Sequence, residues 1–247
     1  MTGQEHARTL NLREVGIALA DRHLMGPLSL TVAPGAVSTI MGPSGCGKSS
    51  LLAFVCGTLD PAFSATGEVL VGRDRVDRLP PEQRRIGILF QDDLLFPHLS
   101  VAENLAFGLP ASLRGRKARQ ERVEEALEEA DLGGFGSRDP ATLSGGQRAR
   151  VALLRTLLSE PRALLLDEPF SKLDVNLRSR FRRFVFDHAR GRGLATLMVT
   201  HDPADAQAAG GQIIEISTPM TERSLGNQQS PGRSGPEMPA RPAPATS

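Results

Sequence analysis

The sequence predicts an α/β fold in which a mostly parallel sheet is flanked by helices. An apolar run at 37–41 is typical of a buried strand, and the helix-like stretch 50–56 follows it after a glycine-rich turn. Two further apolar runs, at 163–166 and 194–200, have the composition of strands that are covered on both faces. We therefore expect buried strands that lie side by side, with helices packed against them.

The turn between the first of these strands and its helix has the phosphate-loop pattern G-x-x-x-x-G-K-[ST], carried by Gly42, Gly47, Lys48 and Ser49. Glycine tolerates the dihedral angles that let a backbone curl around phosphates, and the helix N-terminus favours an anion. Lys48 would reach the β- and γ-phosphates, and the hydroxyl of Ser49 would bind Mg²⁺. The predicted nucleotide-binding residues of this loop are Gly42, Pro43, Ser44, Gly45, Cys46, Gly47, Lys48, Ser49 and Ser50.

Length, charge and hydropathy limit the class of protein. With 247 residues, of which 40% are apolar, the chain can bury a normal core. The 29 basic and 28 acidic residues nearly cancel, which argues against a nucleic-acid partner. The sequence has no apolar run near the about 18 residues of a transmembrane helix, and its first residues lack the apolar core of a signal peptide. The two cysteines suggest no disulfide framework, so a reduced cytosolic setting is expected.

An antiparallel edge sheet is expected beside the phosphate loop. Its strands are predicted at 10–15, 27–32 and 67–71. Such a sheet would lie over the bound nucleotide, next to the main parallel sheet.

A glutamine follows the strand predicted at 85–90. In an α/β sheet, ligands bind in the crevice outside the carboxyl ends of the strands, which is where Gln91 would lie. Its amide oxygen can accept a hydrogen bond from a metal-bound water, and its nitrogen can donate one. Taken alone, Gln91 would be an ordinary surface residue. Its predicted role at the crevice depends on the residues described below.

The region 92–150 is predicted to be a helical subdomain. Ser100 and Glu103 form a capping-box pattern that opens a short helix. The stretch 116–132 has apolar residues at helical spacing and stops at a Gly-Gly pair. Before these helices, the run LLFPHL at 94–99 is apolar and broken by a proline. It is either an interface for a partner or part of the core of this subdomain.

The sequence LSGGQ predicts a second anion-binding site. Ser144 is a good N-cap for a helix at 148–158, and two glycines at a helix start expose backbone donors. The residues of this site are Ser144, Gly145, Gly146 and Gln147. Two phosphate sites in one chain are most simply explained if they face one nucleotide from opposite sides, across a dimer.

Polar residues also end the next two predicted strands. Asp167 would hold Mg²⁺, and Glu168 would be the general base that polarises the attacking water. His201 follows the next strand, and its imidazole could donate a hydrogen bond to a γ-phosphate and so sense its presence.

A last strand is predicted at 212–216, and the composition then changes. Residues 217–247 contain six prolines, many small polar residues and few apolar ones. We interpret this segment as a disordered Pro/Ser-rich tail. The folded domain is therefore expected to span 1–216.

These motifs resemble, in this order, those of the ATP-binding subunits of ABC transporters, over roughly 10–216. The Walker A loop GPSGCGKS, the Q-loop glutamine, the signature LSGGQ, the Walker B run ALLLDE, the D-loop SKLD and the switch histidine are all present. The stretches RIGILFQDDLLF, DPATLSGGQRARVALLR and ALLLDEPFSKLDVNLR look especially like the YnjD-type subunits of bacterial uptake systems. The resemblance implies a P-loop NTPase core and an ATPase that uses ATP and Mg²⁺.

The resemblance also implies a mechanism. Two copies would close head to tail around two ATP molecules, and closure would move a separate membrane permease that imports a solute. The catalytic residues would be Glu168, His201, Gln91 and Lys48, and the metal ligands would be Ser49, Gln91 and Asp167. The second copy would add its LSGGQ residues, and Asp174 of the D-loop would connect the two sites.

The family's partners and location are expectations of the same kind. A helix of the permease would dock on 94–107, and an extracytoplasmic solute-binding protein would complete the system. The chain would lie on the cytoplasmic face of a bacterial inner membrane as a peripheral subunit. Import is favoured over export because exporters often fuse the permease to the cassette, and none is fused here.

The sequence departs from the family at two positions. An aromatic residue that stacks on adenine is common near the position of Leu19, but this neighbourhood has none except His23. Contact with the base would come from His23, from Arg22 or from Leu19 itself. Lys172 stands where the D-loop usually has a small residue, and it would either alter dimer closure or point to solvent.

A soluble ABC-type ATPase that acts as a regulatory or binding module without a permease is the alternative function. Relatives of that class usually carry two cassettes or long coiled coils. This chain has one phosphate loop and no sustained heptad pattern. A phosphate-loop kinase would have no LSGGQ.

Overall fold

A parallel sheet lies at the centre of the computed structural model and has the strand order β6-β7-β8-β3-β9. The structure describes residues 8–216, so the predicted tail at 217–247 lies outside the described residues. The strands are β3 (Val37–Met41), β6 (Ile86–Leu89), β7 (Ala163–Asp167), β8 (Ala195–Thr200) and β9 (Ile213–Glu215). All of β8 and most of β7 are buried, as is typical of parallel strands covered on both faces.

The register of this sheet brings the carboxyl ends of its strands to one edge. Met41 of β3 pairs with Thr200 of β8, and Asp167 of β7 pairs with Val199. Because the strands are parallel, the residues that follow each strand lie at the same edge. The polar residues that the sequence places after these strands are therefore neighbours in space.

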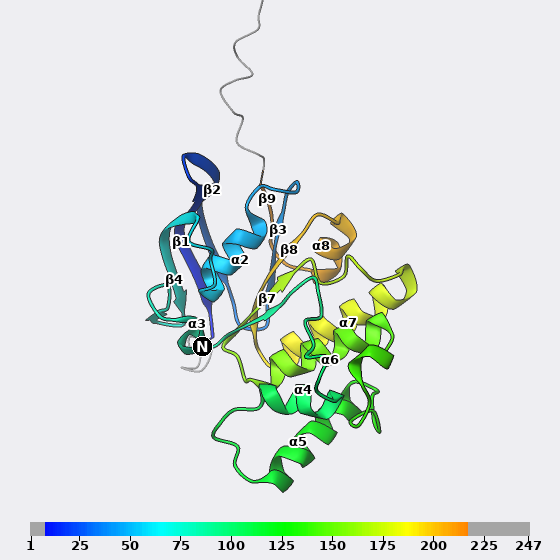
Figure 1. The fold of residues 1–247 in the computed structure, drawn as a ribbon. Helices are drawn as coiled ribbons and strands as arrows, with labels where there is room; N and C mark the ends of the chain where they lie inside the picture. The colour runs from blue at the N-terminus through cyan, green and yellow to red at the C-terminus, as the bar shows by residue number, and fades with distance from the viewer. Residues whose placement is uncertain (1–7, 217–247) are drawn as a thin grey trace, which may run out of the picture.

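A second, antiparallel sheet lies beside the first, and helix α2 (Lys48–Cys56) lies between the two (Figure 1). Its strand order is β2-β1-β4-β5, with the bounds β1 (Leu10–Leu19), β2 (Arg22–Val32), β4 (Phe63–Val71) and β5 (Asp74–Arg75). Leu51, Leu52 and Val55 of α2 are fully buried in a core cluster that includes residues of both sheets. The two sheets therefore share one core.

The strands of the antiparallel sheet are longer than the sequence pattern predicts. β1 and β2 continue to a tight hairpin in which Leu19 pairs with Arg22. Around Glu14, which has a φ of 49°, the register of β1 shifts against both of its neighbours. This irregularity interrupts the alternation of apolar and polar residues by which a strand is recognised, and so the second half of β1 was missed.

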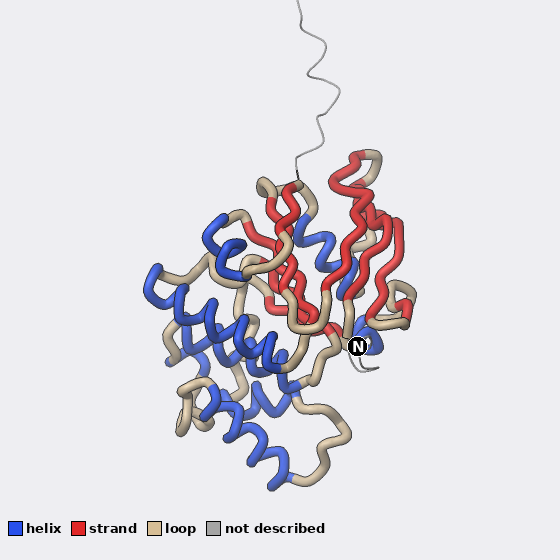
Figure 2. The backbone as a smooth tube through the Cα atoms, turned by 180° about the vertical axis from the view of Figure 1, so that it is seen from behind, coloured by secondary structure: helices blue, strands red, loops and turns tan. Residues whose placement is uncertain are grey.

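The region predicted to be helical forms a layer on the side of the molecule away from the antiparallel sheet (Figures 1 and 2). Its elements are α4 (Val101–Gly108), α5 (Arg116–Glu129), the 3₁₀ turn η1 (Pro140–Thr142) and α6 (Gly145–Leu158). The predicted capping box of α4 is confirmed, since the N–H of Ser100 donates to the Glu103 carboxylate at 2.7 Å and Ser100 Oγ accepts from the N–H of Glu103. The layer has a core of its own, in which Val101, Val123 and Val151 are buried.

Two helices that the sequence analysis did not predict, α7 (Val175–Gly191) and α8 (Pro203–Ala209), complete the fold. Phe181, Val185 and Phe186 of α7 pack in a cluster with Leu164 and Leu166 of β7. The alternate β7 residues belong to the cluster shared with α2, so the strand is covered on both faces. Within the part of the chain that the structure describes, no helix has the length and apolar composition needed to cross a membrane.

A buried arginine closes the C-terminal end of α2. Arg84, which ends α3 (Pro81–Arg84) and is 6% exposed, donates from Nη1 to the carbonyl oxygens of Phe54 at 2.6 Å and Val55 at 3.1 Å. Its remaining nitrogens donate to two backbone carbonyls outside the helix, at 2.7 and 2.8 Å. Burial lowers the pKa of Arg84, although the ordinary value is so high that the guanidinium stays charged. The side chain thus gives the carbonyl of Val55 a donor at the helix end and adds a second donor for that of Phe54, which also accepts from the N–H of Gly57 at 3.2 Å.

We predict that Arg84→Met lowers the free energy of unfolding by about 2–4 kcal/mol, because it removes the four hydrogen bonds that Arg84 donates to backbone carbonyls. Urea denaturation followed by far-UV circular dichroism measures this, since the chain has no Trp or Tyr to report by fluorescence. Arg73→Ala, at an exposed position in the turn before β5, is the matched control and should change stability by less than about 0.5 kcal/mol. Equal stability of the two variants would contradict the role of Arg84.

Candidate functional site

A hollow of about 520 Å³ opens at the edge where the parallel strands end. Its walls come from β1, β2 and β4, from the loop and helix after β3, and from the ends of β6 and β7. The lining residues are Leu19, Arg22, Leu24, Ser44, Gly45, Gly47, Lys48, Ser49, Ser50, Phe63, Gln91, Asp167 and Glu168. The structure therefore brings together most of the phosphate-loop residues, the predicted glutamine and both predicted carboxylates.

The loop after β3 presents donors to this hollow. α2 begins at Gly47 without a side-chain cap, so the first backbone N–H groups of the helix are available to an anion. Gly45 and Gly47 have φ values of 79° and 91°, a left-handed backbone that favours glycine. The ammonium group of Lys48 donates to the carbonyl oxygens of Gly42 at 2.7 Å and Pro43 at 2.9 Å. A nearly buried cation thus lies over the loop, which fits the binding of phosphates.

Three of the predicted loop residues do not line the hollow, namely Gly42, Pro43 and Cys46. The carbonyl groups of Gly42 and Pro43 hold Lys48, as described above. Cys46 is 1% exposed and its side chain packs inside the protein. Cys56, at the end of α2, is also a buried free thiol, and burial raises its pKa. Both sulfur atoms are therefore shielded from solvent.

Ser49 and Asp167 meet inside the hollow. Ser49 Oγ, in the first turn of α2, donates to Asp167 Oδ1 at the end of β7 over 3.0 Å. Burial raises the pKa of Asp167, the hydrogen bond from Ser49 opposes the rise, and the neighbouring Glu168 adds to it. A partly buried carboxylate beside a second acid is stabilised by a cation. A hydroxyl and a carboxylate are oxygen ligands of the kind that Mg²⁺ takes.

A metal at this point would need ligands from the bound molecule as well. Across residues 8–216, no group of three or more His, Cys, Asp or Glu side chains is arranged to hold a metal ion. Mg²⁺ is often bound by one or two protein oxygens together with substrate phosphates and water. The pair Ser49 and Asp167 next to the phosphate loop fits that arrangement.

Glu168 and His201 form a second contact at the same edge. His201 Nδ1 lies 3.0 Å from Glu168 Oε2, where the carboxylate is 19% exposed and the imidazole 56% exposed. Glu168 has a φ of 44°, which is uncommon for a residue with a side chain. Its N–H donates to the carbonyl of Val199 in β8 at 3.0 Å, which fixes this strained backbone to the neighbouring strand. The carboxylate is thereby aimed along the edge toward His201.

The apolar wall of the hollow contains a residue that the sequence analysis missed. Phe63 is the first residue of β4 and pairs with Leu19, the last residue of β1. Both line the hollow, and Arg22 joins them from the start of β2, whereas His23 does not line it. The pairing joins positions that are far apart in the sequence, so only the strand register could have pointed to Phe63. The hollow thus has an aromatic residue in its lining.

The residues of LSGGQ do not line this hollow. Ser144 caps α6, where its Oγ accepts from the N–H of Gln147 and its own N–H donates to Gln147 Oε1 at 2.9 Å. Gly146 is buried, and a Cβ there would lie 2.5 Å from the side chain of Leu177. Asp174 accepts from the N–H of Leu177 at 3.0 Å and lies at the start of α7. Within one chain, these residues and the phosphate loop are therefore separate.

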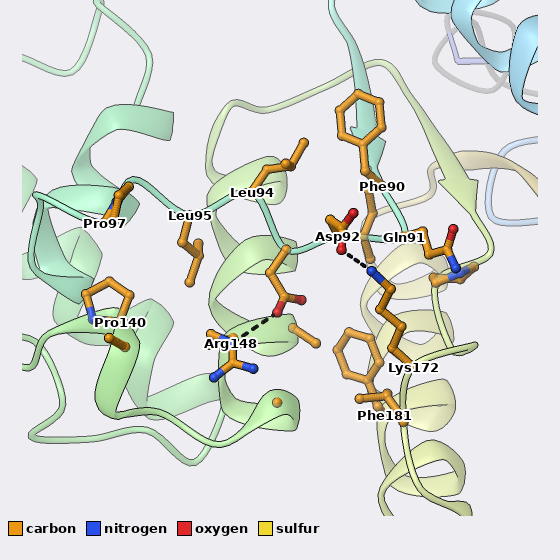
Figure 3. Close-up of a pocket in the computed structure, with 17 residues that line it drawn as sticks. Phe90, Gln91, Asp92, Leu94, Leu95, Pro97, Pro140, Arg148, Lys172 and Phe181 are labelled. Atoms are coloured by element: carbon orange, nitrogen blue, oxygen red, sulfur yellow. Dashed lines mark hydrogen bonds and ion pairs between the residues drawn. The ribbon is translucent and has the colours of Figure 1, made fainter.

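A second hollow, of about 580 Å³, lies beside Gln91 between the end of β6 and the helical layer (Figure 3). Asp93 pairs there with Arg148 of α6, with 3.4 Å between Oδ2 and Nε. Burial raises the pKa of Asp93, and Arg148 opposes that rise. The segment after β6 is in this way attached to the helix that carries LSGGQ.

The apolar run at 94–99 was expected to be either a partner interface or part of the core. In the structure it consists of half-buried and exposed residues. Leu95 packs against both the sheet and the core of the helical layer. Leu94 is 56% exposed, and Phe107 of α4 is 69% exposed. The ring of Phe107 meets the ring of Phe96 edge to face at 4.8 Å between centroids. The stretch thus contributes both to the core and to an exposed apolar surface.

Comparison with known proteins gives consistent matches. The family model described as "ABC transporter" matches residues 25–171. The uncharacterized ABC transporter ATP-binding protein YnjD of Escherichia coli (strain K12) is 52% identical over 199 residues, which are 81% of this chain and 91% of that protein. The Fe(3+) ions import ATP-binding protein FbpC of Brucella abortus (strain 2308) is 43% identical over 83% of this chain, and this chain spans 56% of that protein. The solved dimeric structure of MJ0796, a bacterial ABC transporter cassette, has a TM-score of 0.70 and 30% identity, covering 84% of this chain and 94% of its own.

We predict that Asp167→Asn raises the melting temperature at pH 7 by up to about 2 °C when no ligand is present. Because folding raises the pKa of Asp167, ionisation of this carboxyl group lowers stability fully above the raised pKa, and the cost shrinks as the pH falls through that pKa and is gone below the ordinary pKa. Asparagine removes the charge and keeps an oxygen that can accept from Ser49. Thermal denaturation by circular dichroism measures the shift.

The control for this substitution is Asp187→Asn, at an exposed position of α7, which should leave the melting temperature unchanged. The gain at Asp167 should also shrink in buffers acidic enough to protonate the carboxyl group. A lower melting temperature for Asp167→Asn at pH 7 would contradict the cost of this buried charge.

Proposed function

Because the chain belongs to the ABC transporter family as one of its ATP-binding proteins and is an ATPase, we propose that it drives solute import through a separate membrane permease. One observation carries the ATP-hydrolysing part of this proposal, and the import ATP-binding proteins among the relatives support the part on import. The phosphate loop with Lys48, the Ser49–Asp167 contact and the Glu168–His201 contact all lie at one edge of the parallel sheet. A triphosphate site next to a carboxylate base is what ATP hydrolysis requires.

ATP binds in the hollow with its phosphates on the loop 42–50. The backbone N–H groups at the start of α2 and the ammonium group of Lys48 bind the β- and γ-phosphates. The adenine lies on the apolar wall made by Leu19 and Phe63, with Arg22 at its edge. Stacking on an aromatic face contributes roughly 0.5–1.5 kcal/mol beyond the burial of area. Phe63 thus supplies the aromatic contact that the sequence near Leu19 lacks.

Mg²⁺ would be held by Ser49 and Asp167, and by Gln91, which lines the same hollow. The ion would neutralise charge on the phosphates during transfer. The raised pKa of Asp167 supports this assignment, since a nearby cation removes the cost of its ionisation.

Glu168 is the general base for hydrolysis. Its carboxylate accepts a proton as a water molecule attacks the γ-phosphorus and the bond to the β-phosphate oxygen breaks. His201, at 3.0 Å, orients this carboxylate and can donate to a γ-phosphate oxygen. Gln91 also lines the hollow, and its amide can orient the same water.

Two copies of the chain form a head-to-tail dimer in which LSGGQ of one copy closes over the ATP of the other. The exposed position of Ser144 at the start of α6 and the exposed Asp174 support this arrangement. Val175, next to Asp174, is 85% exposed, and an apolar side chain so open to solvent is suited to an interface. The similar cassette MJ0796 is dimeric.

The permease docks on the apolar surface made by Leu94, Phe96 and Phe107, beside the segment that follows Gln91. Contact at this surface would let ATP-driven closure move the membrane partner. The chain is accordingly a peripheral protein of the cytoplasmic face of a bacterial inner membrane, and an extracytoplasmic solute-binding protein completes the system. The solute is selected by those partners and not by the residues described here.

We predict that Glu168→Gln binds ATP with unchanged affinity but hydrolyses it at least about 10²-fold more slowly, which is the usual scale for loss of a general base. Steady-state release of phosphate measures the rate, and equilibrium binding of a fluorescent ATP analogue measures the affinity. Glu160→Gln is the matched control, because Glu160 also has a left-handed backbone and lies exposed just before β7, away from the hollow. Turnover of Glu168→Gln close to that of Glu160→Gln would show that Glu168 is not the base.

We also predict that Phe107→Asp abolishes co-purification with a membrane protein while leaving the affinity for ATP unchanged. A charge on the exposed aromatic ring would disrupt an apolar interface but not the distant nucleotide site. The measurement is affinity capture of the tagged chain from detergent-solubilised membranes, followed by mass spectrometry.

Ala111→Asp adds the same charge at an exposed site in the loop after α4 and should keep the partner. Capture of a polytopic membrane protein by the unmodified chain and by Ala111→Asp, but not by Phe107→Asp, is the expected result. Absence of the unmodified chain from membranes would instead favour the soluble regulatory ATPase.

A further inference from the structure

Lys172 forms an ion pair with Asp92, and its side chain remains half exposed to solvent (Figure 3). Asp92 belongs to the segment after β6, and Lys172 belongs to the loop at 171–174 between β7 and α7. Lys172 Nζ donates to Asp92 Oδ1, so the contact joins residues that are 80 positions apart. The side chains keep exposed fractions of 54% and 67%, respectively.

The loop that carries Lys172 also holds the backbone of Glu168. The N–H of Ser171 donates to the carbonyl oxygen of Glu168 at 3.2 Å, and Ser171 Oγ donates to the same oxygen at 2.9 Å. Glu168 has the strained φ of 44°, and such a backbone persists only where the surroundings hold it. Lys172 is therefore the neighbour of Ser171, which fixes the carbonyl group of Glu168, the proposed general base.

The segment that carries Asp92 is anchored at its other end to the helical layer. Arg155 of α6 donates to the carbonyl oxygen of Leu94 at 3.0 Å, and Arg148 pairs with Asp93. Gln91, immediately before Asp92, lines the nucleotide hollow. The segment thus connects the hollow, the helix of LSGGQ and the exposed Leu94.

Stability alone does not account for this ion pair. Exposed pairs contribute roughly 0–1 kcal/mol, and salt screens them. Only three of the 29 basic residues are lysines, and one of these is Lys48 in the phosphate loop. What the pair does add is a direct link between two loops that line the same hollow.

We propose that the Asp92–Lys172 ion pair ties the segment after β6 to the loop that holds Glu168, and that Lys172 is a positioning residue for hydrolysis. A shift of the segment at 91–94 would then move Lys172, the adjacent Ser171 and the carbonyl of Glu168 together. In this way the proposed permease-docking surface, which includes Leu94, is coupled to the general base Glu168. The inference rests on the proposed ATPase function of the same site.

The test is steady-state ATP hydrolysis by the full chain with Mg²⁺, for Asp92→Asn, Lys172→Met, the double variant and the charge-reversed pair Asp92→Lys with Lys172→Asp. Each single variant should lower kcat roughly threefold to tenfold and leave KM for ATP within about twofold, because the nucleotide contacts are intact. The double variant should be no slower than the slower single variant. The charge-reversed pair should regain at least about half of the unmodified kcat.

Lys117→Met is the control, because Lys117 forms an exposed ion pair with Glu121 on α5, at 3.7 Å and away from the hollow. It should leave kcat unchanged. Single variants as fast as the unmodified chain, or additive losses without rescue by charge reversal, would overturn the tie while leaving the ATPase function in place. An unmodified chain that does not hydrolyse ATP would overturn the proposed function itself, and the tie with it.

Discussion

The parallel pairing of β3, β7 and β8 is the constraint on which the site depends. Pairing of Met41 with Thr200 and of Asp167 with Val199 brings three chain segments to one edge. The phosphate loop, the two carboxylates and His201 each follow one of these strands, so their distances are set by backbone hydrogen bonds rather than by flexible loops. A register shift of one residue would turn the buried side chains of β7 and β8 to the wrong faces, so the core protects the geometry of the site.

The site is also where the fold accepts unfavourable local interactions. Glu168 keeps a left-handed backbone, Asp167 is a partly buried acid beside another acid, and α2 begins without a side-chain cap. The starts of α4 and α6 are capped by side chains and Arg84 binds the carbonyls at the end of α2, whereas α3 and α5 also begin without a side-chain cap. What distinguishes the site is that an uncapped helix start and a pair of acids lie in one hollow, as is expected where the missing partners belong to a bound ligand.

What the sequence predicts well depends on local signals. The buried strands β7 and β8, the capping box of α4 and the loop before α2 follow from residues within a few positions of one another. Phe63 and the partner of Lys172 could not be found in that way, because the first depends on pairing with Leu19 across β1 and β4 and the second on two loops 80 positions apart. Helix α7 was not predicted, although its apolar residues Phe181, Phe184 and Val185 recur at helical spacing with arginines between them.

The burial of both cysteines has a practical consequence for spectroscopy. Cys46 and Cys56 are 1% and 7% exposed, and the chain contains no other cysteine. A thiol introduced at an exposed position would therefore be the one that reacts with a maleimide dye or a nitroxide under native conditions, without removal of the native cysteines. Distances between two labelled copies could then be followed through a cycle of nucleotide addition and removal in an otherwise unaltered protein.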